Sequence, residues 1–276
     1  MRLVSIVLAA SCFLLFSCSP NNVSTDNGIK KYFDSVGARG SFGLFDNAEG
    51  QFTIYDLAAF KDSAYPPGTS FSIVNTLIGV ESGRLANEDM VLPWDGKPAF
   101  YPGGDTATAW NRDLSAKQAF AVSAEPFFRQ LARRIGKDTM QLWLDSIGYG
   151  QRYGKFRINN NLDTFWLDDS LKVTADEQLG LVKKLYFDQL PFFKRTMKVV
   201  RDLMLQEQNS NYALYYQAGG DGRRLEWVTG WIEENRHPYF FVVELVDPHQ
   251  GADRRTEAVR VLKGILKEKG FFLGKK

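Results

Sequence analysis

The alternation of apolar and polar positions predicts a β-hairpin near the start of the chain and three more strands near its end. The segment "GSFGLFDNAEGQFTIYD" alternates around an Asn- and Gly-containing turn, which predicts strands over 41–45 and 51–55. Towards the C-terminus, "YALYYQAGG", "RLEWVTGWIEE" and "YFFVVELVD" are typical of three successive strands. Strand-forming segments therefore lie at both ends of the chain.

Apolar positions spaced three and four residues apart predict helices between these strands and at the C-terminus. In "YPPGTSFSIVNTLIGVESGRL" a Pro- and Gly-rich loop leads into an apolar helix, and Thr69 or Ser70 can cap it. Thr174 and Glu177 have the spacing of a capping box at the start of another helix. Further helices are expected over 110–135, 138–148, 169–195, 194–208 and 254–269.

The order of these elements predicts the fold class. A hairpin, a helical middle region, antiparallel strands and a terminal helix indicate an α+β domain whose N- and C-terminal segments share one sheet. The chain has 276 residues, 44% of them hydrophobic, which is enough for a sizeable core. We expect one folded domain over 39–276, without internal repeats.

The N-terminus has the pattern of an export signal. Arg2 precedes an apolar run over 3–16, which is short for a membrane span and has the form of a signal-peptide core; a short membrane anchor is the alternative. The motif "LFSC" resembles a bacterial lipobox, in which Cys18 becomes the lipidated first residue. This predicts a signal peptide over 1–17, a flexible tether over 18–38, and a protein held by lipid in the bacterial cell envelope.

Composition excludes several classes of site. The net charge of +2 comes from interspersed basic and acidic residues, which argues against nucleic-acid binding. The only histidines, His237 and His249, form no ligand pattern and argue against a Ser-His-Asp triad. Cys12 lies inside the signal core, so the mature chain has no cysteine beyond the lipidated one. No metal site, disulfide or cofactor is expected, and "GGDGRR" is interpreted as a hairpin turn.

Several segments together resemble one enzyme family. The segments "YPPGTSFSIVNTL", "SAE", "YGQ", "FWLDDSLKVTADEQ", "LYYQAGG" and "WVTGWIEE" occur in an order and at spacings that resemble class D (oxacillinase-type) serine β-lactamases and the related penicillin-sensing domains. The resemblance runs from about Ser41 to the C-terminus. It implies a β-lactamase/transpeptidase-like α+β fold.

The family carries out catalysis with a small set of motifs. A S-x-x-K motif begins a helix, and its lysine, carboxylated by CO₂, takes the serine proton so that the serine can attack the lactam carbonyl. A second hydroxyl, from S-x-V, relays protons, and a tryptophan steadies the carboxylated lysine. A K-T-G strand and an arginine bind the substrate carboxylate, and backbone amides form the oxyanion hole.

The resemblance assigns these roles to particular residues. The run "F-x-I-x-N-T-L" sets the register, which puts Thr69 at the nucleophile position and Ser72 at the lysine position. Ser123 matches the second hydroxyl, whereas Glu125 stands where the family has an apolar residue. Substrate-binding positions fall on Trp166, Gln217, Ala218, Gly219 and either Arg254 or Arg255.

These substitutions remove the family's base. A serine hydroxyl at position 72 cannot form a carbamate, and loss of one member of a nucleophile–base pair costs on the order of 10⁶-fold in a comparable hydrolase. We therefore expect a penicillin-binding pseudoenzyme that binds a β-lactam, a peptidoglycan peptide or a protein partner. One alternative is residual acyl-enzyme hydrolysis by Thr69 or Ser123 with Glu125 as base. Another is a structural envelope protein with a closed pocket.

Each of these residues also has a purely structural interpretation. Thr69 can act as a helix cap, Ser72 and Ser123 can fill a helix contact, and Trp166 can be a core aromatic. Glu125 can pair with Arg129 one helical turn along.

Overall fold

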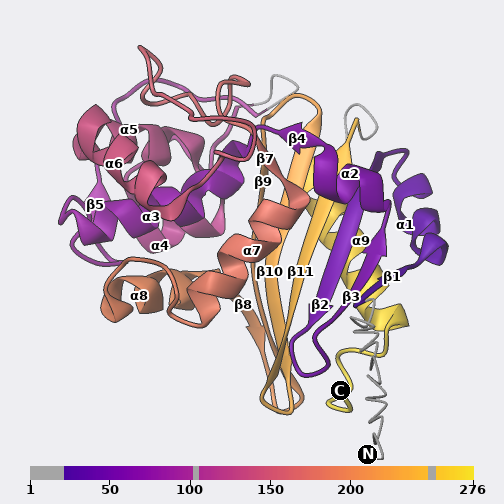
Figure 1. The fold of residues 1–276 in the computed structure, drawn as a ribbon. Coiled ribbons are helices and arrows are strands. Elements are labelled where there is room, and N and C mark those ends of the chain that lie inside the picture. The colour runs from indigo at the N-terminus through magenta and orange to yellow at the C-terminus, as the bar shows by residue number, and fades with distance from the viewer. Residues whose placement is uncertain (1–21, 102–105, 248–252) are drawn as a thin grey trace, which may run out of the picture.

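The computed structural model describes residues 22–101, 106–247 and 253–276 (Figure 1). The predicted signal peptide, the lipidation site at Cys18 and His249 lie outside these ranges. Within the described ranges, no helix combines the length and apolar character needed to cross a membrane.

A seven-stranded sheet runs through the molecule and joins the two ends of the chain. Its order is β1-β3-β2-β11-β10-β9-β8, antiparallel throughout except where β1 pairs parallel with β3. The hairpin strand β2 lies against the late strand β11, with Phe42 opposite Val243, so the predicted sharing of one sheet is confirmed. The strands are β1 (Val23–Thr25), β2 (Arg39–Asp46), β3 (Gln51–Tyr55), β8 (Leu205–Gln208), β9 (Tyr212–Gly220), β10 (Leu225–Glu234) and β11 (His237–Val246).

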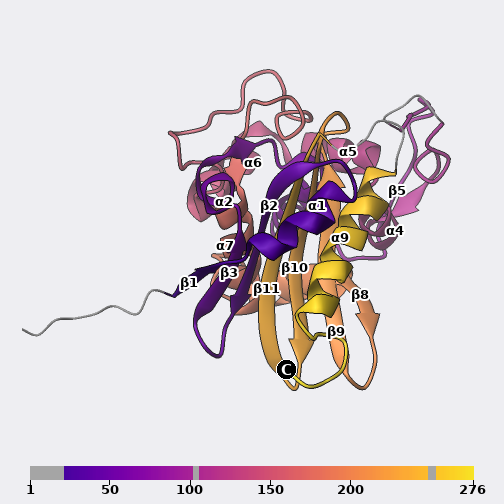
Figure 2. The ribbon, with the colours of Figure 1, turned by 90° about the vertical axis from the view of Figure 1, so that its right-hand side faces the viewer.

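The two faces of the sheet carry separate layers of helices. On one face lie α9 (Arg254–Glu268) and α1 (Lys30–Asp34), which Figure 2 shows crossing in front of the strands. Because side chains alternate along a strand, Val228 and Ile232 of β10 pack under α9, whereas Trp227 and Trp231 pack into the helical region on the opposite face.

The helical region is built around α3 (Ser72–Glu81), which is buried over most of its length. Its apolar side chains, among them Ile73, Val74 and Leu77, have no solvent exposure. The other elements on this side of the sheet are α2 (Leu57–Asp62), α4 (Ala116–Ala121), α5 (Glu125–Ile135), α6 (Lys137–Ile147), α7 (Ala175–Tyr186), α8 (Lys194–Met204), the 3₁₀ turn η2 (Gly68–Phe71), and the two-residue strand pairs β4 (Ala64–Tyr65) with β7 (Val173–Thr174) and β5 (Val91–Leu92) with β6 (Leu114–Ser115). A second 3₁₀ turn, η1 (Asn27–Ile29), directly precedes α1 on the opposite face.

Three predicted helices are wrong in extent. The helix expected over 169–195 is confined to α7, because Thr174 caps its start and the helix ends at Tyr186. The helix expected over 110–135 is two helices, α4 and α5, separated where Ser123 adopts a φ of 50°. Pro126 explains part of this break, because proline is tolerated in the first turn of a helix and disrupts its interior. The helix expected over 194–208 ends at Met204, and the next four residues pair with β9 as the edge strand β8.

The expected tether over 18–38 is also wrong for its described part. From residue 22 onwards the chain belongs to the folded domain: β1 pairs with β3, and Ile29, Phe33 and Val36 are buried. The spacing of these three apolar residues places them on one side of the turn-and-helix segment, which packs against α9. The domain therefore begins before residue 39.

Candidate functional site

Thr69 lies in η2, where the chain passes closely against the end of β9. Gly68 has a φ of +57°, and a Cβ built there would lie 2.1 Å from the carbonyl carbon of Gly220. A Cβ on Gly219 would lie 2.1 Å from Oγ1 of Thr69. Only glycine at both positions permits this approach, which puts the Thr69 hydroxyl directly over the strand.

The Thr69 side chain is half-buried, and it does not cap the helix. Pro67 precedes η2 and Phe71 precedes α3, and neither element has a capping side chain. The prediction that Thr69 caps is therefore wrong. Among the described residues, no group forms a hydrogen bond with the Thr69 hydroxyl.

Ser72, Ser123 and Gln217 meet below Thr69 in one buried network. The Gln217 amide nitrogen donates to Ser72 Oγ at 2.8 Å and to Ser123 Oγ at 3.1 Å, and it also approaches the Phe120 carbonyl oxygen at 3.4 Å. Ser123 Oγ donates to the Ala218 carbonyl oxygen at 2.7 Å. All the members of this network are uncharged at neutral pH, so it contains no general base.

The structure thus brings together residues that lie far apart in the sequence. α3 supplies Ser72, the break between α4 and α5 supplies Ser123, and β9 supplies Gln217. The carbonyl oxygen of the Gln217 amide is buried without a hydrogen-bond partner in the described structure.

A second polar chain runs beside this network. Ser70 Oγ donates to the Pro67 carbonyl oxygen at 2.6 Å and accepts from the Gln178 amide at 3.0 Å. Gln178 in turn accepts from the Tyr149 hydroxyl at 3.2 Å. Burial holds the Tyr149 pKa well above its usual value, so this hydroxyl is a donor and not a base. Tyr149 and Gln178 lie in segments that resemble the family, but no sequence pattern indicated a role for either residue.

Trp166 is part of the core under η2. Its indole stacks on Phe71 with the ring centroids 5.0 Å apart and an interplanar angle of 18°, and it meets Phe165 edge-on. Its carbonyl oxygen accepts the Gly68 backbone N–H at 2.9 Å. Trp166 therefore positions the turn that carries Thr69.

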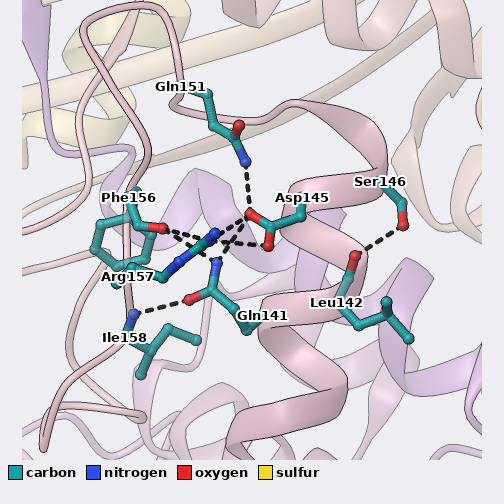
Figure 3. A network of polar contacts seen from close by, with 8 residues as sticks. All are labelled: Gln141, Leu142, Asp145, Ser146, Gln151, Phe156, Arg157 and Ile158. Atoms are coloured by element: carbon teal, nitrogen blue, oxygen red, sulfur yellow. Dashed lines mark hydrogen bonds and ion pairs between the residues drawn. The ribbon is translucent and has the colours of Figure 1, made fainter.

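A polar network on α6 holds the start of the long segment that leads to Trp166. Figure 3 shows Asp145 accepting hydrogen bonds from Gln141, Gln151 and Arg157, at 3.1, 2.8 and 2.7 Å. The Arg157 guanidinium lowers the Asp145 pKa. Gln141 also accepts the Ile158 backbone N–H at 2.8 Å, so α6 anchors this segment at both side-chain and backbone groups.

Glu125 is the first residue of α5 and is directed towards its own helix. Its carboxylate lies 3.4 Å from the Arg129 guanidinium, which confirms the predicted pairing one turn along. Burial raises the Glu125 pKa, and the Arg129 charge opposes this shift. In the described structure Glu125 makes no hydrogen bond to Thr69, Ser123 or Trp166.

The two candidate arginines both bind backbone carbonyl groups. Arg255 donates to the Ala121 carbonyl oxygen at 2.7 Å, two residues before Ser123. Arg254 donates to the Arg223 carbonyl oxygen in the turn between β9 and β10. Arg255 therefore contacts the end of α4, which leads to Ser123.

Comparisons with known proteins agree on one similarity. The family model for the penicillin binding protein transpeptidase domain matches residues 45–267. The chain is 31% identical over 247 residues to β-lactamase OXA-5 of Pseudomonas aeruginosa, covering 86% of this chain and 88% of that protein. It is 32% identical over 240 residues to the probable β-lactamase YbxI of Bacillus subtilis (strain 168), covering 82% and 83%. Among solved structures, it is similar to the class D β-lactamase FUS-1 (OXA-85) from Fusobacterium nucleatum subsp. polymorphum, with a TM-score of 0.80 at 28% identity, covering 92% of this chain and 100% of that one.

Proposed function

Because this chain belongs to the penicillin-binding transpeptidase family and, within it, to the class D β-lactamases, we propose that it is a pseudoenzyme of that class. Its cleft binds a β-lactam, a peptidoglycan peptide or a protein partner without the family's hydrolysis. The observation that carries the proposal is the uncharged network of Ser72, Ser123 and Gln217 beneath Thr69.

Hydrolysis through an acyl-enzyme needs a group that removes the nucleophile's proton at neutral pH. Ser72 and Ser123 are hydroxyls and Gln217 is an amide, so none of them performs that role. Glu125, the candidate for an alternative base, makes no hydrogen bond to Thr69 or Ser123 in the described structure and contacts only Arg129, at 3.4 Å. A threonine nucleophile is also more restricted in its rotamers than a serine.

The retained features support binding. Thr69 remains partly exposed, and the two glycines at the end of β9 keep the strand close to η2. A half-exposed hydroxyl beside a buried, uncharged network can position a ligand without reacting with it.

Intact-mass spectrometry and thermal unfolding of the full-length protein with a penicillin test the proposal. We expect an unchanged protein mass, no turnover of a chromogenic cephalosporin, and a ligand-dependent rise in Tm. A covalent adduct or turnover would favour the residual hydrolase instead. An unchanged mass with an unchanged Tm would favour a structural protein with a closed pocket.

Two variants localise any binding. Thr69→Tyr places a ring in the space above β9 and should abolish the rise in Tm. Thr53→Tyr makes the same change at a half-buried position of β3, outside the cleft, and should leave the ligand-dependent rise intact.

The lipobox-like motif supports a further part of the proposal, that the protein is exported and anchored in the cell envelope through Cys18. Metabolic labelling with a radioactive fatty acid should mark the protein expressed in bacteria, and Cys18→Ser should remove the label, whereas Cys12→Ser should not. Label retained in Cys18→Ser, or absent from the unaltered protein, would contradict lipidation at this residue.

A further inference from the structure

A groove whose lining does not include Thr69 lies between the segment 95–100 and the first half of α5. Its volume is about 680 Å³, which is within the range of sites for small organic ligands. The network of Ser72, Ser123 and Gln217 is not part of its lining. We call it the Arg129 groove; it is lined by Asp95, Lys97, Pro98, Ala99, Phe100, Trp110, Glu125, Pro126, Arg129 and Arg133.

The outer wall of the Arg129 groove is held in place by specific hydrogen bonds. The Asn111 side chain accepts from the Ala99 backbone N–H at 2.7 Å and donates to the Ala99 carbonyl oxygen at 3.0 Å. The Trp110 indole donates to the Val122 carbonyl oxygen at 3.0 Å. These contacts fix the wall relative to the start of α5, so the groove is largely formed before a ligand arrives.

Of the two arginines that line the groove, Arg129 is the more loosely paired. Arg133 binds Asp163 directly, whereas the same carboxylate lies 3.7 Å from Nε of Arg129. Glu125 approaches Arg129 no closer than 3.4 Å. Good charge-assisted hydrogen bonds are about 2.7–2.9 Å long, so both contacts are loose. Within the described structure, Nε of Arg129 is buried without a hydrogen-bond partner.

The other lining residues indicate which charge and which apolar groups a ligand of this groove would carry. Lys97 and Arg133 add positive charge, against Asp95 and Glu125. Glu125 competes for Arg129 only through the 3.4 Å contact, which is long for a charge-assisted hydrogen bond. Phe100 is 56% exposed and Trp110 also lines the groove, so apolar surface lies beside the guanidinium.

We propose that the Arg129 groove binds a small carboxylate ligand that carries an aromatic ring. The carboxylate pairs with the Arg129 guanidinium in the bidentate geometry that suits these two groups, and it displaces Glu125. The ring packs against Phe100 and Trp110. Binding here is independent of chemistry at Thr69.

N-acetylphenylalanine and its uncharged amide are matched probes for calorimetric titration of the full-length protein. We expect the acid to bind saturably and to weaken as salt is added, and the amide to bind at least about tenfold more weakly. Equal affinities for the acid and the amide, or no saturable binding, would overturn the proposal.

Three variants test the assignment to Arg129. Arg129→Gln should lower the affinity for the acid by about tenfold or more, since it removes a charge-assisted pair. Arg134→Gln removes an exposed charge from the same helix outside the groove and should have no effect. Glu125→Gln removes the competing carboxylate and should tighten binding several-fold, a gain that mere structural damage would not produce. Equal losses in Arg129→Gln and Arg134→Gln, or weaker binding in Glu125→Gln, would contradict the assignment.

Discussion

The triple variant Thr69→Ser/Ser72→Lys/Gln217→Lys is expected to form a covalent adduct with a penicillin, where the unaltered protein forms none. The three substitutions place a serine and two lysines at the positions to which the resemblance to class D β-lactamases assigns the nucleophile, the base and the strand ammonium. Because the loss of one member of such a set costs on the order of 10⁶-fold in a comparable hydrolase, even partial recovery should raise turnover by about 10³-fold.

The surrounding geometry favours this recovery. Ser72 lies one helical turn from Thr69, so a lysine there projects towards the hydroxyl above it. Ser123 is already held beside the site by its bond to the Ala218 carbonyl oxygen. Replacing Gln217 removes the amide that now contacts Ser72 Oγ.

Added bicarbonate gives this experiment a specific readout. A lysine that works as a carbamate should give faster turnover with bicarbonate, and the double variant Thr69→Ser/Gln217→Lys, which lacks it, should not respond. If the folded triple variant gives no adduct, features beyond these three residues keep the site inactive. The proposed cause of inactivity would then be wrong.

The second large effect is expected in the pH dependence of stability. Two glutamates are buried on central strands of the sheet: Glu226 near the start of β10 and Glu244 on β11. Burial raises the pKa of each to about 8. Arg255 opposes the shift at Glu226, whereas Asp56 adds to the shift at Glu244. One carboxyl oxygen of each is without a hydrogen-bond partner in the described structure, as is the hydroxyl of Ser41 opposite Glu244.

Both glutamates therefore bind a proton more tightly in the folded than in the unfolded state. Their contribution to stability is fully present below the unfolded pKa of about 4.5, and it is lost as the pH rises to about 8. Within that window, each proton bound only by the folded state changes the free energy of unfolding by about 1.4 kcal/mol per pH unit. Carboxylates with lowered pKa values, such as Asp26 and Asp145, change the free energy of unfolding only at lower pH.

Guanidinium unfolding at pH 5, 7 and 9 measures this effect. The free energy of unfolding should fall between pH 5 and pH 8, and Glu244→Gln should remove a large part of that fall because the amide is always uncharged. Glu49→Gln changes an exposed carboxylate in the turn between β2 and β3 and should leave the slope unaltered. A slope that is the same in Glu244→Gln and in the unaltered protein would show that Glu244 ionises normally.

The spacing of apolar residues predicted secondary structure correctly where the local sequence and the tertiary packing favour the same element. The hairpin, the three late strands and the Thr174–Glu177 capping box all appear as predicted, because each rests on neighbouring residues and on one buried face. The strand β8 was predicted as the end of a helix. Its residues form a strand because they pair with β9, a contact that the local sequence does not reveal. Residues 22–38 are polar enough to indicate a tether, yet a few apolar side chains among them are buried against α9.

For the site, the sequence alone determined the residue types, and the resemblance to class D β-lactamases predicts that Ser72 stands at the position of the family's lysine base. The tertiary structure decided what these residues contact. The Gln217 amide bonds to Ser72 and Ser123 because a strand, a buried helix and a helix break converge from distant parts of the chain. The direction of Glu125 towards Arg129 follows from the point at which α5 begins. Residue identity is a local property of the chain, whereas hydrogen-bond partners, burial and pKa shifts depend on its folded neighbours.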